Sequence, residues 1–419
     1  MKNIATNIYD WRPTTPFYYG WLILSTAAIG ALIAGSVAQT VFGGIQDLIG
    51  QETGWNRKTV ALAATLGTWS SGLTMPFIGR LVDRFGPRWI MLIAANMVGI
   101  GYIYLSNSNT LFEFFFAYIV IRAVAGPNLQ NVVPRAVAVN FFSRRRNFAI
   151  GITTLNRVIS ESINIQAITL LATSYSWRIA YRILGIAAIP LSVPIFLFIR
   201  HKPEDIGLLP DGEKQSSTES KAIPQTTSLS VKKIISLKSF WLILIGEFVA
   251  VTATSMIIFQ IVPYLVDAGM TQTVAAAALT IGNALGGLSV PGWGYLTDRY
   301  TTKRLAIVIL TSAITMTLLL LFAPEGNIQF IVVIAWGIVT AVIFVLGTMM
   351  LGTVFERTSF GTVVGITGPS RTAAMGLGPY VGALAASWYG DYTLIFIAAT
   401  IGYSLAIALY SSVQPRNTL

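Results

Sequence analysis

Two arginines lie at matching places within apolar stretches of the chain. The motif Gly151-Ile-Thr-x-x-x-Arg157 recurs 214 residues later as Gly365-Ile-Thr-x-x-x-Arg371. An ionised guanidinium is costly in hydrocarbon, so each side chain must face protein or water rather than lipid. A guanidinium stays charged at physiological pH and binds a carboxylate through two parallel hydrogen bonds. The repeat predicts that Arg157 and Arg371 bind an anionic substrate; two structural arginines that bind backbone carbonyls are the alternative.

Other polar side chains within apolar stretches extend this predicted site. Asn156 directly precedes Arg157, and Arg122 lies in a separate apolar stretch. We predict that both bind substrate, although a structural role for Arg122 is an equally good interpretation.

Two glutamates are candidates for proton coupling. Glu161 lies four residues after Arg157, so both side chains share one face of a helix. A carboxylate beside an arginine in a cavity can take a proton and release the arginine for substrate; a static salt bridge is the alternative. Glu247 is the second candidate. The charges within apolar stretches, Arg122, Arg157 and Arg371 against Glu161 and Glu247, leave a positive excess that favours an anionic substrate.

The elements that carry these residues are predicted to be membrane-spanning helices. With 54% hydrophobic and only 11% charged residues, the composition is that of a polytopic membrane protein. We expect an all-α membrane protein with twelve transmembrane helices, at residues 17–42, 59–79, 89–106, 112–134, 148–172, 178–199, 239–263, 273–295, 304–323, 328–351, 361–386 and 393–412. The sequence has no cysteine, no cluster of catalytic residues and no phosphate-binding glycine-rich loop, so we expect neither an enzyme nor a nucleotide-driven pump, and no cofactor or metal.

The basic residues outside the predicted helices give the orientation. If both termini lie on one side, that side holds twenty lysines and arginines, and the other holds only Arg57, Lys58, Arg178 and Arg182. Positive residues are retained on the cytoplasmic side of a membrane. We therefore predict a multi-pass protein of the plasma (inner) membrane with both termini in the cytoplasm. The net charge of +11 is explained by topology, so no nucleic-acid partner is expected.

A second repeated motif divides the chain into two copies. The run Gly79-x-x-x-Asp83-Arg84-x-Gly86-x-Arg88 returns 215 residues later in degenerate form as Gly294-x-x-x-Asp298-Arg299. We predict that four charged residues order these cytoplasmic loops in one conformation and act in gating, namely Asp83, Arg84, Asp298 and Arg299. The expected organisation is a six-helix bundle at 1–199, a cytoplasmic linker at 200–238 and a second six-helix bundle at 239–419. Repeats of this kind place the substrate site between the halves, near the midplane.

This loop motif, its degenerate copy and the twelve-helix layout resemble the major facilitator superfamily. The resemblance covers essentially the whole chain and implies two pseudo-symmetric six-helix halves that transport a substrate. Within the superfamily, three features look like the branch of monocarboxylate transporters and oxalate/formate antiporters: Tyr19-Gly-Trp21, Gly54-Trp55 and the run from Lys202 to Gly212.

This chain lacks one residue that is typical of that branch. Its members usually place a key arginine in the eighth helix, where this chain offers only Asn283. The basic residue that oxalate/formate antiporters carry in the eleventh helix has a counterpart in Arg371. The resemblance therefore implies a carboxylate site around Arg371, but the other substrate residues of the branch cannot be transferred.

Together these patterns predict a secondary transporter that moves a small organic anion, a mono- or dicarboxylate, by alternating access. Two kinds of coupling are compatible with the sequence. In proton symport the protein is a symporter, and in anion exchange it is an antiporter. The alternatives are transport of another anion such as nitrate, phosphate or a sugar acid, and a membrane sensor, for which residues 200–238 are too short an output domain. The expected partners are the anion, protons or a counter-anion, and the lipid bilayer, with the protein a monomer.

Overall fold

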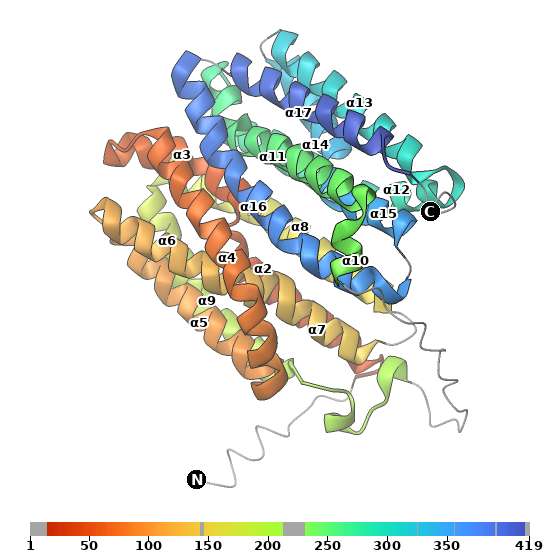
Figure 1. The fold of residues 1–419 in the computed structure, drawn as a ribbon. Helices are drawn as coiled ribbons and strands as arrows, with labels where there is room; N and C mark the ends of the chain where they lie inside the picture. The colour runs from red at the N-terminus through yellow and green to blue at the C-terminus, as the bar shows by residue number, and fades with distance from the viewer. Residues whose placement is uncertain are drawn as a thin grey trace. The chain divides into compact units, whose positions relative to one another are not determined.

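The structure is a computed structural model that describes residues 15–142, 146–212, 231–324, 326–355, 357–389 and 392–414. Throughout this part of the chain the regular structure is helical (Figure 1). The chain forms two compact units, residues 1–41 with 70–221, and residues 42–69 with 222–419. Each unit is described by itself below.

The first unit contains the helices of the N-terminal half. The elements of this half are α2 (Tyr19–Gly35), α3 (Gln39–Thr53), α4 (Arg57–Phe85), α5 (Pro87–Ser106), α6 (Leu111–Ala125), the π-helix η1 (Gly126–Asn131), α7 (Val132–Phe141), α8 (Arg146–Ser174) and α9 (Trp177–Phe198). Of these, residues 42–53 of α3 and residues 57–69 of α4 belong to the second unit. Within the first unit α5 packs along α9, and α2 packs along α8 (Figure 1).

Local sequence explains where several of these helices begin. Gly86 has φ 77°, a left-handed conformation that glycine adopts without strain, and Pro87 then starts α5 at a position where its missing N–H is not needed. Thr110 and Glu113 form a capping box at the start of α6. Ser176 accepts a hydrogen bond from the Ile179 amide and so caps α9.

The second unit contains the helices of the C-terminal half. Besides residues 42–53 of α3 and the first part of α4, it comprises α10 (Val231–Ser236), α11 (Lys238–Asp267), α12 (Gln272–Arg299), α13 (Thr302–Phe322), α14 (Asn327–Thr340), α15 (Ile343–Val354), α16 (Arg357–Tyr389) and α17 (Thr393–Ser411). The central helix is α11, which packs along α16 and α17 (Figure 1) and also contacts α15.

The twelve predicted transmembrane stretches each correspond to one helix or to a run of two or three successive helices. Nine helical segments in the described part of the chain are long and apolar enough to cross a membrane. The other three predicted stretches correspond to α4, α8 and α16, which carry polar residues along their length. The predicted all-helical membrane fold is therefore confirmed.

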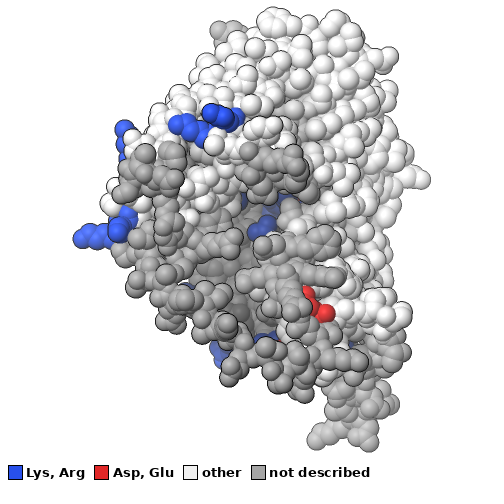
Figure 2. Space-filling model, turned by 90° about the vertical axis from the view of Figure 1, so that its right-hand side faces the viewer, with Lys and Arg blue, Asp and Glu red and all other residues white. Residues whose placement is uncertain are grey.

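The surface agrees with a lipid environment. Large apolar side chains are exposed on many helices, for example Phe77, Ile100, Phe112, Leu288 and Ile331. On the face drawn in Figure 2, lysines and arginines lie at a few places, and a broad area of described residues has no charged side chain. Exposed apolar surface of this extent is unusual in a water-soluble monomer and is expected where helices contact lipid.

The predicted first stretch is interrupted, because α2 ends at Gly35 and α3 begins at Gln39. Backbone carbonyls freed inside a membrane need internal donors, since no water reaches them. Three buried tyrosine hydroxyls supply such donors: Tyr102 to the Ile33 carbonyl (2.8 Å), Tyr118 to Val37 (3.0 Å) and Tyr181 to Ser36 (3.1 Å). The Asn164 amide on α8 donates to the Leu32 carbonyl at 2.9 Å. Side chains of α5, α6, α8 and α9 thus stabilise the interruption by donating hydrogen bonds to its backbone carbonyls.

The predicted division into 1–199, 200–238 and 239–419 stays a prediction. Residues 42–69 group with the second unit by contact, and residues 213–230 of the expected linker lie outside the described residues.

Candidate functional site

Arg371 on α16 lies in a polar cluster that joins three helices of the second unit. Its Nε donates to Glu247 Oε1 on α11 at 2.7 Å, and its Nη2 donates to Thr348 Oγ1 on α15 at 2.5 Å. The side chain of Glu247 is 2% exposed, whereas that of Arg371 is 28% exposed. A buried carboxylate therefore orients an arginine whose outer part is open.

Glu247 fits against α15 because the neighbouring residue there is a glycine. A Cβ atom at Gly347 would lie 2.5 and 2.7 Å from the two carboxylate oxygens, which is closer than real contacts allow. In the described part of the chain, Glu247 Oε2 is buried without a hydrogen-bond partner. This oxygen can accept a proton without displacing a donor.

Arg157 and Glu161 form a second ion pair, which lies in the first unit. Arg157 Nη1 lies 3.0 Å from Glu161 Oε1, with the side chains 28% and 14% exposed. Both residues belong to α8, as their spacing of four predicts. The neighbouring Asn156 donates to the Leu24 carbonyl at 3.1 Å, so this amide joins α8 to α2. The two pairs lie in different units.

Arg122 lies on α6, deeper in the first unit than Arg157. It is buried and lies near the phenols of Tyr102 and Tyr118, which donate to the carbonyls around the α2–α3 interruption. The backbone carbonyl of Arg122 accepts the Gly126 N–H at the start of η1. Arg122 thus lies beside the tyrosines that bind the end of α2. Its contact with substrate stays a prediction.

Of the four predicted gating residues, only Arg84 has a described side chain. It is exposed, and its guanidinium carbon lies 5.2 Å from the centre of the Phe85 ring. The side chains of Asp83, Asp298 and Arg299 lie outside the described residues.

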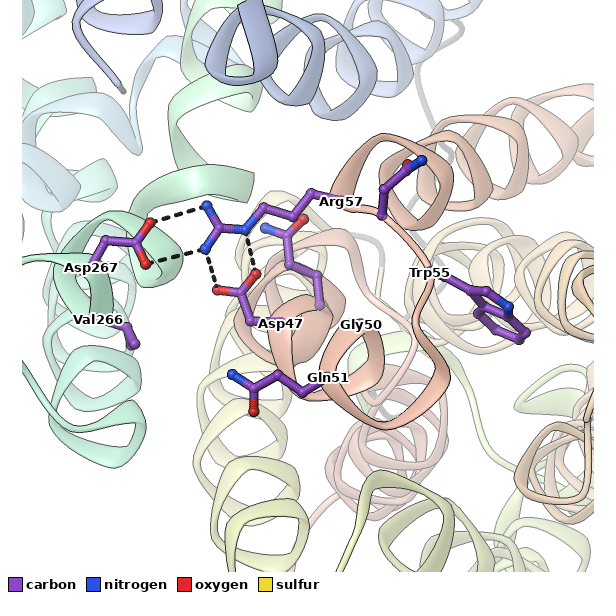
Figure 3. Close-up of a pocket in the computed structure, with 9 residues that line it drawn as sticks. Asp47, Gly50, Gln51, Trp55, Arg57, Val266 and Asp267 are labelled. Atoms are coloured by element: carbon purple, nitrogen blue, oxygen red, sulfur yellow. Dashed lines mark hydrogen bonds and ion pairs between the residues drawn. The ribbon is translucent and has the colours of Figure 1, made fainter. Parts of the chain in front are cut away.

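A third arginine cluster was not predicted from the sequence. Arg57, the first residue of α4, binds two carboxylates at once: Nε and Nη2 donate to Asp47 on α3 at 2.6 and 3.1 Å, and Nη1 and Nη2 donate to Asp267 at the end of α11 at 3.0 and 3.2 Å (Figure 3). Arg57 Nη1 also donates to the Tyr392 hydroxyl at 2.7 Å. These five hydrogen bonds use all five guanidinium N–H groups.

The surroundings of Arg57 include an open pocket. Its volume is about 340 Å³, and it is lined by Gln46, Asp47, Gly50, Gln51, Trp55, Asn56, Arg57, Val266 and Asp267 (Figure 3). Burial raises the pKa of the Tyr392 phenol, so this hydroxyl keeps the proton that it donates to Asp267 at 2.6 Å. The sequence held one signal for this cluster, namely charges of opposite sign at the ends of stretches predicted to lie on the same side.

Comparison with known proteins bears on the whole chain. The sequence profile of the Major Facilitator Superfamily matches residues 27–379 and, in a second match, residues 243–418. The oxalate:formate antiporter of Oxalobacter formigenes is 22% identical over 363 residues, which are 85% of this chain and 82% of that protein. An uncharacterized transporter, YcxA of Bacillus subtilis (strain 168), is 21% identical over 372 residues, 84% of this chain and 83% of that protein.

Solved structures show the same fold. A bacterial homolog of the human lysosomal transporter Spinster, in an inward-facing and unoccupied conformation, has a TM-score of 0.72 at 14% identity over 96% of this chain and 95% of that one. The nucleoside transporter NupG has a TM-score of 0.70 at 12% identity over 94% and 98%. The predicted resemblance and the twelve-helix fold are thereby confirmed. Because the family profile covers most of its length, the chain belongs to the major facilitator superfamily and is a transporter rather than an enzyme.

Proposed function

We propose that this transporter moves a small organic anion, a mono- or dicarboxylate, by alternating access with proton coupling or anion exchange. The observation that carries the proposal is the state of the two repeat-related arginines. Arg157 and Arg371 are each paired with one glutamate, and each keeps about a quarter of its side chain exposed, at 28%. An arginine that is oriented by protein but still open is suited to bind an incoming carboxylate.

The glutamates supply the proposed coupling. A substrate carboxylate competes with Glu161 for Arg157 and with Glu247 for Arg371, since each arginine is held by a carboxylate already. Protonation of the glutamate removes its charge and frees the guanidinium for substrate. In proton symport the proton and the anion then bind together, whereas in exchange a second anion takes the place of the first.

The relatives support an anionic substrate, and its identity is a separate question. The name of the Oxalobacter formigenes relative states that it exchanges oxalate and formate, both small carboxylates, and this supports anion exchange at 22% identity. The structural neighbours include a nucleoside transporter, but likeness at 12% identity concerns the fold alone. Nitrate, phosphate and sugar acids stay as alternative substrates within the same proposal of an anion transporter.

Thermal unfolding of the purified protein with a panel of ligands tests the substrate class. A ligand at a hundred times its dissociation constant stabilises the folded state by about 2.7 kcal/mol. We expect mono- and dicarboxylates to raise the melting temperature, and sugars, nucleosides and organic cations at the same concentration to leave it unchanged. A shift with nucleosides or cations alone would overturn the anion proposal.

We further propose that both termini and the linker lie in the cytoplasm, because basic residues concentrate on that side. In the same proposal the protein is a monomer and lies in the plasma (inner) membrane. A protease added to intact cells is expected to leave residues 214–233 uncut, while inside-out vesicles are cut there. Cleavage from outside would invert the topology. In the same proposal Asp83, Arg84, Asp298 and Arg299 order the cytoplasmic loops during gating.

A further inference from the structure

Thr348 on α15 uses its hydroxyl differently from its neighbours. Thr340 on α14 donates to the Trp336 carbonyl at 2.8 Å, and Thr353 on α15 donates to the Met350 carbonyl at 2.7 Å. Both hydroxyls are thus bound to the backbone of their own helix, as is common for threonine in membranes. Thr348 instead accepts a hydrogen bond from Arg371 Nη2 at 2.5 Å.

A hydroxyl that accepts one hydrogen bond still has its own hydrogen to donate. Among the residues that the structure describes, Thr348 Oγ1 donates to no other group. Its side chain is partly exposed, like that of Arg371. The hydroxyl hydrogen is therefore available to a ligand that reaches Arg371.

The guanidinium of Arg371 is oriented so that one edge remains open. Its Nε is used by Glu247, and one hydrogen of Nη2 is used by Thr348. Within the described residues Nη1 has no hydrogen-bond partner. Nη1 belongs to the same planar guanidinium as Nη2, which lies 2.5 Å from Thr348 Oγ1. The N–H groups of Nη1 and the Thr348 hydroxyl can therefore donate to the two oxygens of one carboxylate.

We propose that Thr348 binds the transported anion directly. Its hydroxyl donates to one carboxylate oxygen while Arg371 donates to the other. This inference rests on the proposed anion transport and adds an uncharged ligand to it. An uncharged donor fixes the position of the carboxylate without adding to the charge that Glu247 already balances.

Gly347 makes this arrangement possible. Since it has no Cβ, α15 approaches the Glu247 carboxylate closely enough to place the next residue, Thr348, beside Arg371. The two adjacent positions thus have different tasks. Gly347 makes room for the glutamate behind the arginine, and Thr348 presents a donor on its open side.

Replacement of Thr348 by valine tests the proposal, because valine keeps the branched shape and removes the hydroxyl. We expect the dissociation constant for a stabilising carboxylate, and the KM for its uptake, to rise about tenfold, the effect expected for loss of a hydrogen bond to a charged group. The turnover rate at saturating substrate stays within about twofold of the wild type, because the proton-coupling residues are unchanged. Thr348→Ser restores the affinity.

Thr353→Val is the matched control, since this threonine lies on the same helix and donates only to its backbone. It is expected to leave affinity unchanged. A second variant, Thr348→Ala, guards against misfolding of the valine variant and is expected to bind as weakly. Unchanged affinity in whichever of these two variants folds, or a serine variant as weak as alanine, would overturn the proposal.

Different results would contradict anion transport and the role of Thr348. If no anion stabilises or is transported by the wild-type protein, the proposed function falls and this inference falls with it. If carboxylates bind the wild type and Thr348→Ala with equal affinity, only the assignment of Thr348 is wrong.

Discussion

The second unit contains two clusters in which an arginine is bound by carboxylate and hydroxyl groups, and they differ in how many guanidinium N–H groups are used. Arg57 makes five hydrogen bonds, to two aspartates and a tyrosine, and has no N–H group left to offer. Among the residues that the structure describes, Arg371 makes two, to Glu247 and Thr348. The difference lies in the number of acceptors that the fold brings to each arginine.

This difference separates an arginine that joins helices from one that is ready for a ligand. With every N–H group satisfied, Arg57 ties α3 and α4 to α11 and to Tyr392, and a further anion could bind it only by displacing an aspartate. Arg371 is held firmly by a buried carboxylate and still keeps an open edge. Arg157, which in the described part of the chain has one hydrogen bond, to Glu161, resembles Arg371 in this respect.

The largest expected effect comes from removing the planar fork while keeping the charge. A lysine at 371 cannot bind Glu247, Thr348 and a carboxylate in the directions that a guanidinium allows. We expect Arg371→Lys and Arg157→Lys each to fold and insert, and each to lower transport at least about tenfold, equivalent to about 1.4 kcal/mol. Uptake of a labelled carboxylate into proteoliposomes measures the loss.

The double variant sharpens this result. Residues that share a partner lose less together than the sum of their separate losses. If Arg157→Lys/Arg371→Lys loses less transport than the sum of the two single losses, the two arginines bind one substrate. Additive losses indicate independent roles. Normal transport by both single variants would remove them from the site and leave Arg122 as the remaining predicted anion contact.

A second prediction concerns the glutamates that hold the open arginines. Glu161→Gln and Glu247→Gln remove the titratable charge but keep an oxygen that accepts from arginine. Protonation releases the arginine, so wild-type affinity for the anion should rise as the pH falls. In the variant that replaces the coupling glutamate, this pH dependence disappears.

Transport assays test each of the two glutamates by itself. The variant of the coupling residue should retain counterflow exchange of labelled substrate and lose accumulation driven by a pH gradient. Equal loss of both activities would mean that the glutamate concerned has a structural role. We expect the effect to be clear for Glu247, whose second oxygen is buried without a partner in the described part of the chain, as well as for Glu161.

The sequence predicted some of these arrangements because they depend on local spacing. The pairing of Arg157 with Glu161 follows from their four-residue separation within one helix. The pairing of Arg371 with Glu247 joins residues 124 positions apart, and the sequence showed only that both lie within apolar stretches. Thr348 was not predicted, since threonine is common in such helices and nothing local distinguishes it from Thr353.

The helices were predicted well for the same reason, and their interruptions less well. An apolar run of sufficient length indicates a transmembrane helix by itself. Gly126 and Pro127 gave a local reason for the π-helix η1 between α6 and α7. The end of α14 at Thr340 has neither glycine nor proline among residues 339–342. At the end of α2, tyrosines from three other helices donate to the backbone carbonyls, and the sequence does not show those contacts.

The smallest expected effect is that of Arg57→Lys, which tests whether saturation marks a structural arginine. Its side chain is 37% exposed, so solvent screens the network and the loss of stability should be about 1 kcal/mol. We expect the melting temperature to fall by about 2 °C and the affinity for carboxylates to stay within about twofold. The control is Arg182→Lys, because Arg182 is exposed and donates to Asn107 at 2.9 Å; it should change neither quantity. If Arg57→Lys weakened anion binding as strongly as Arg371→Lys, the number of satisfied N–H groups would not distinguish the two clusters, and the open pocket beside Arg57 would have to be considered part of the anion path.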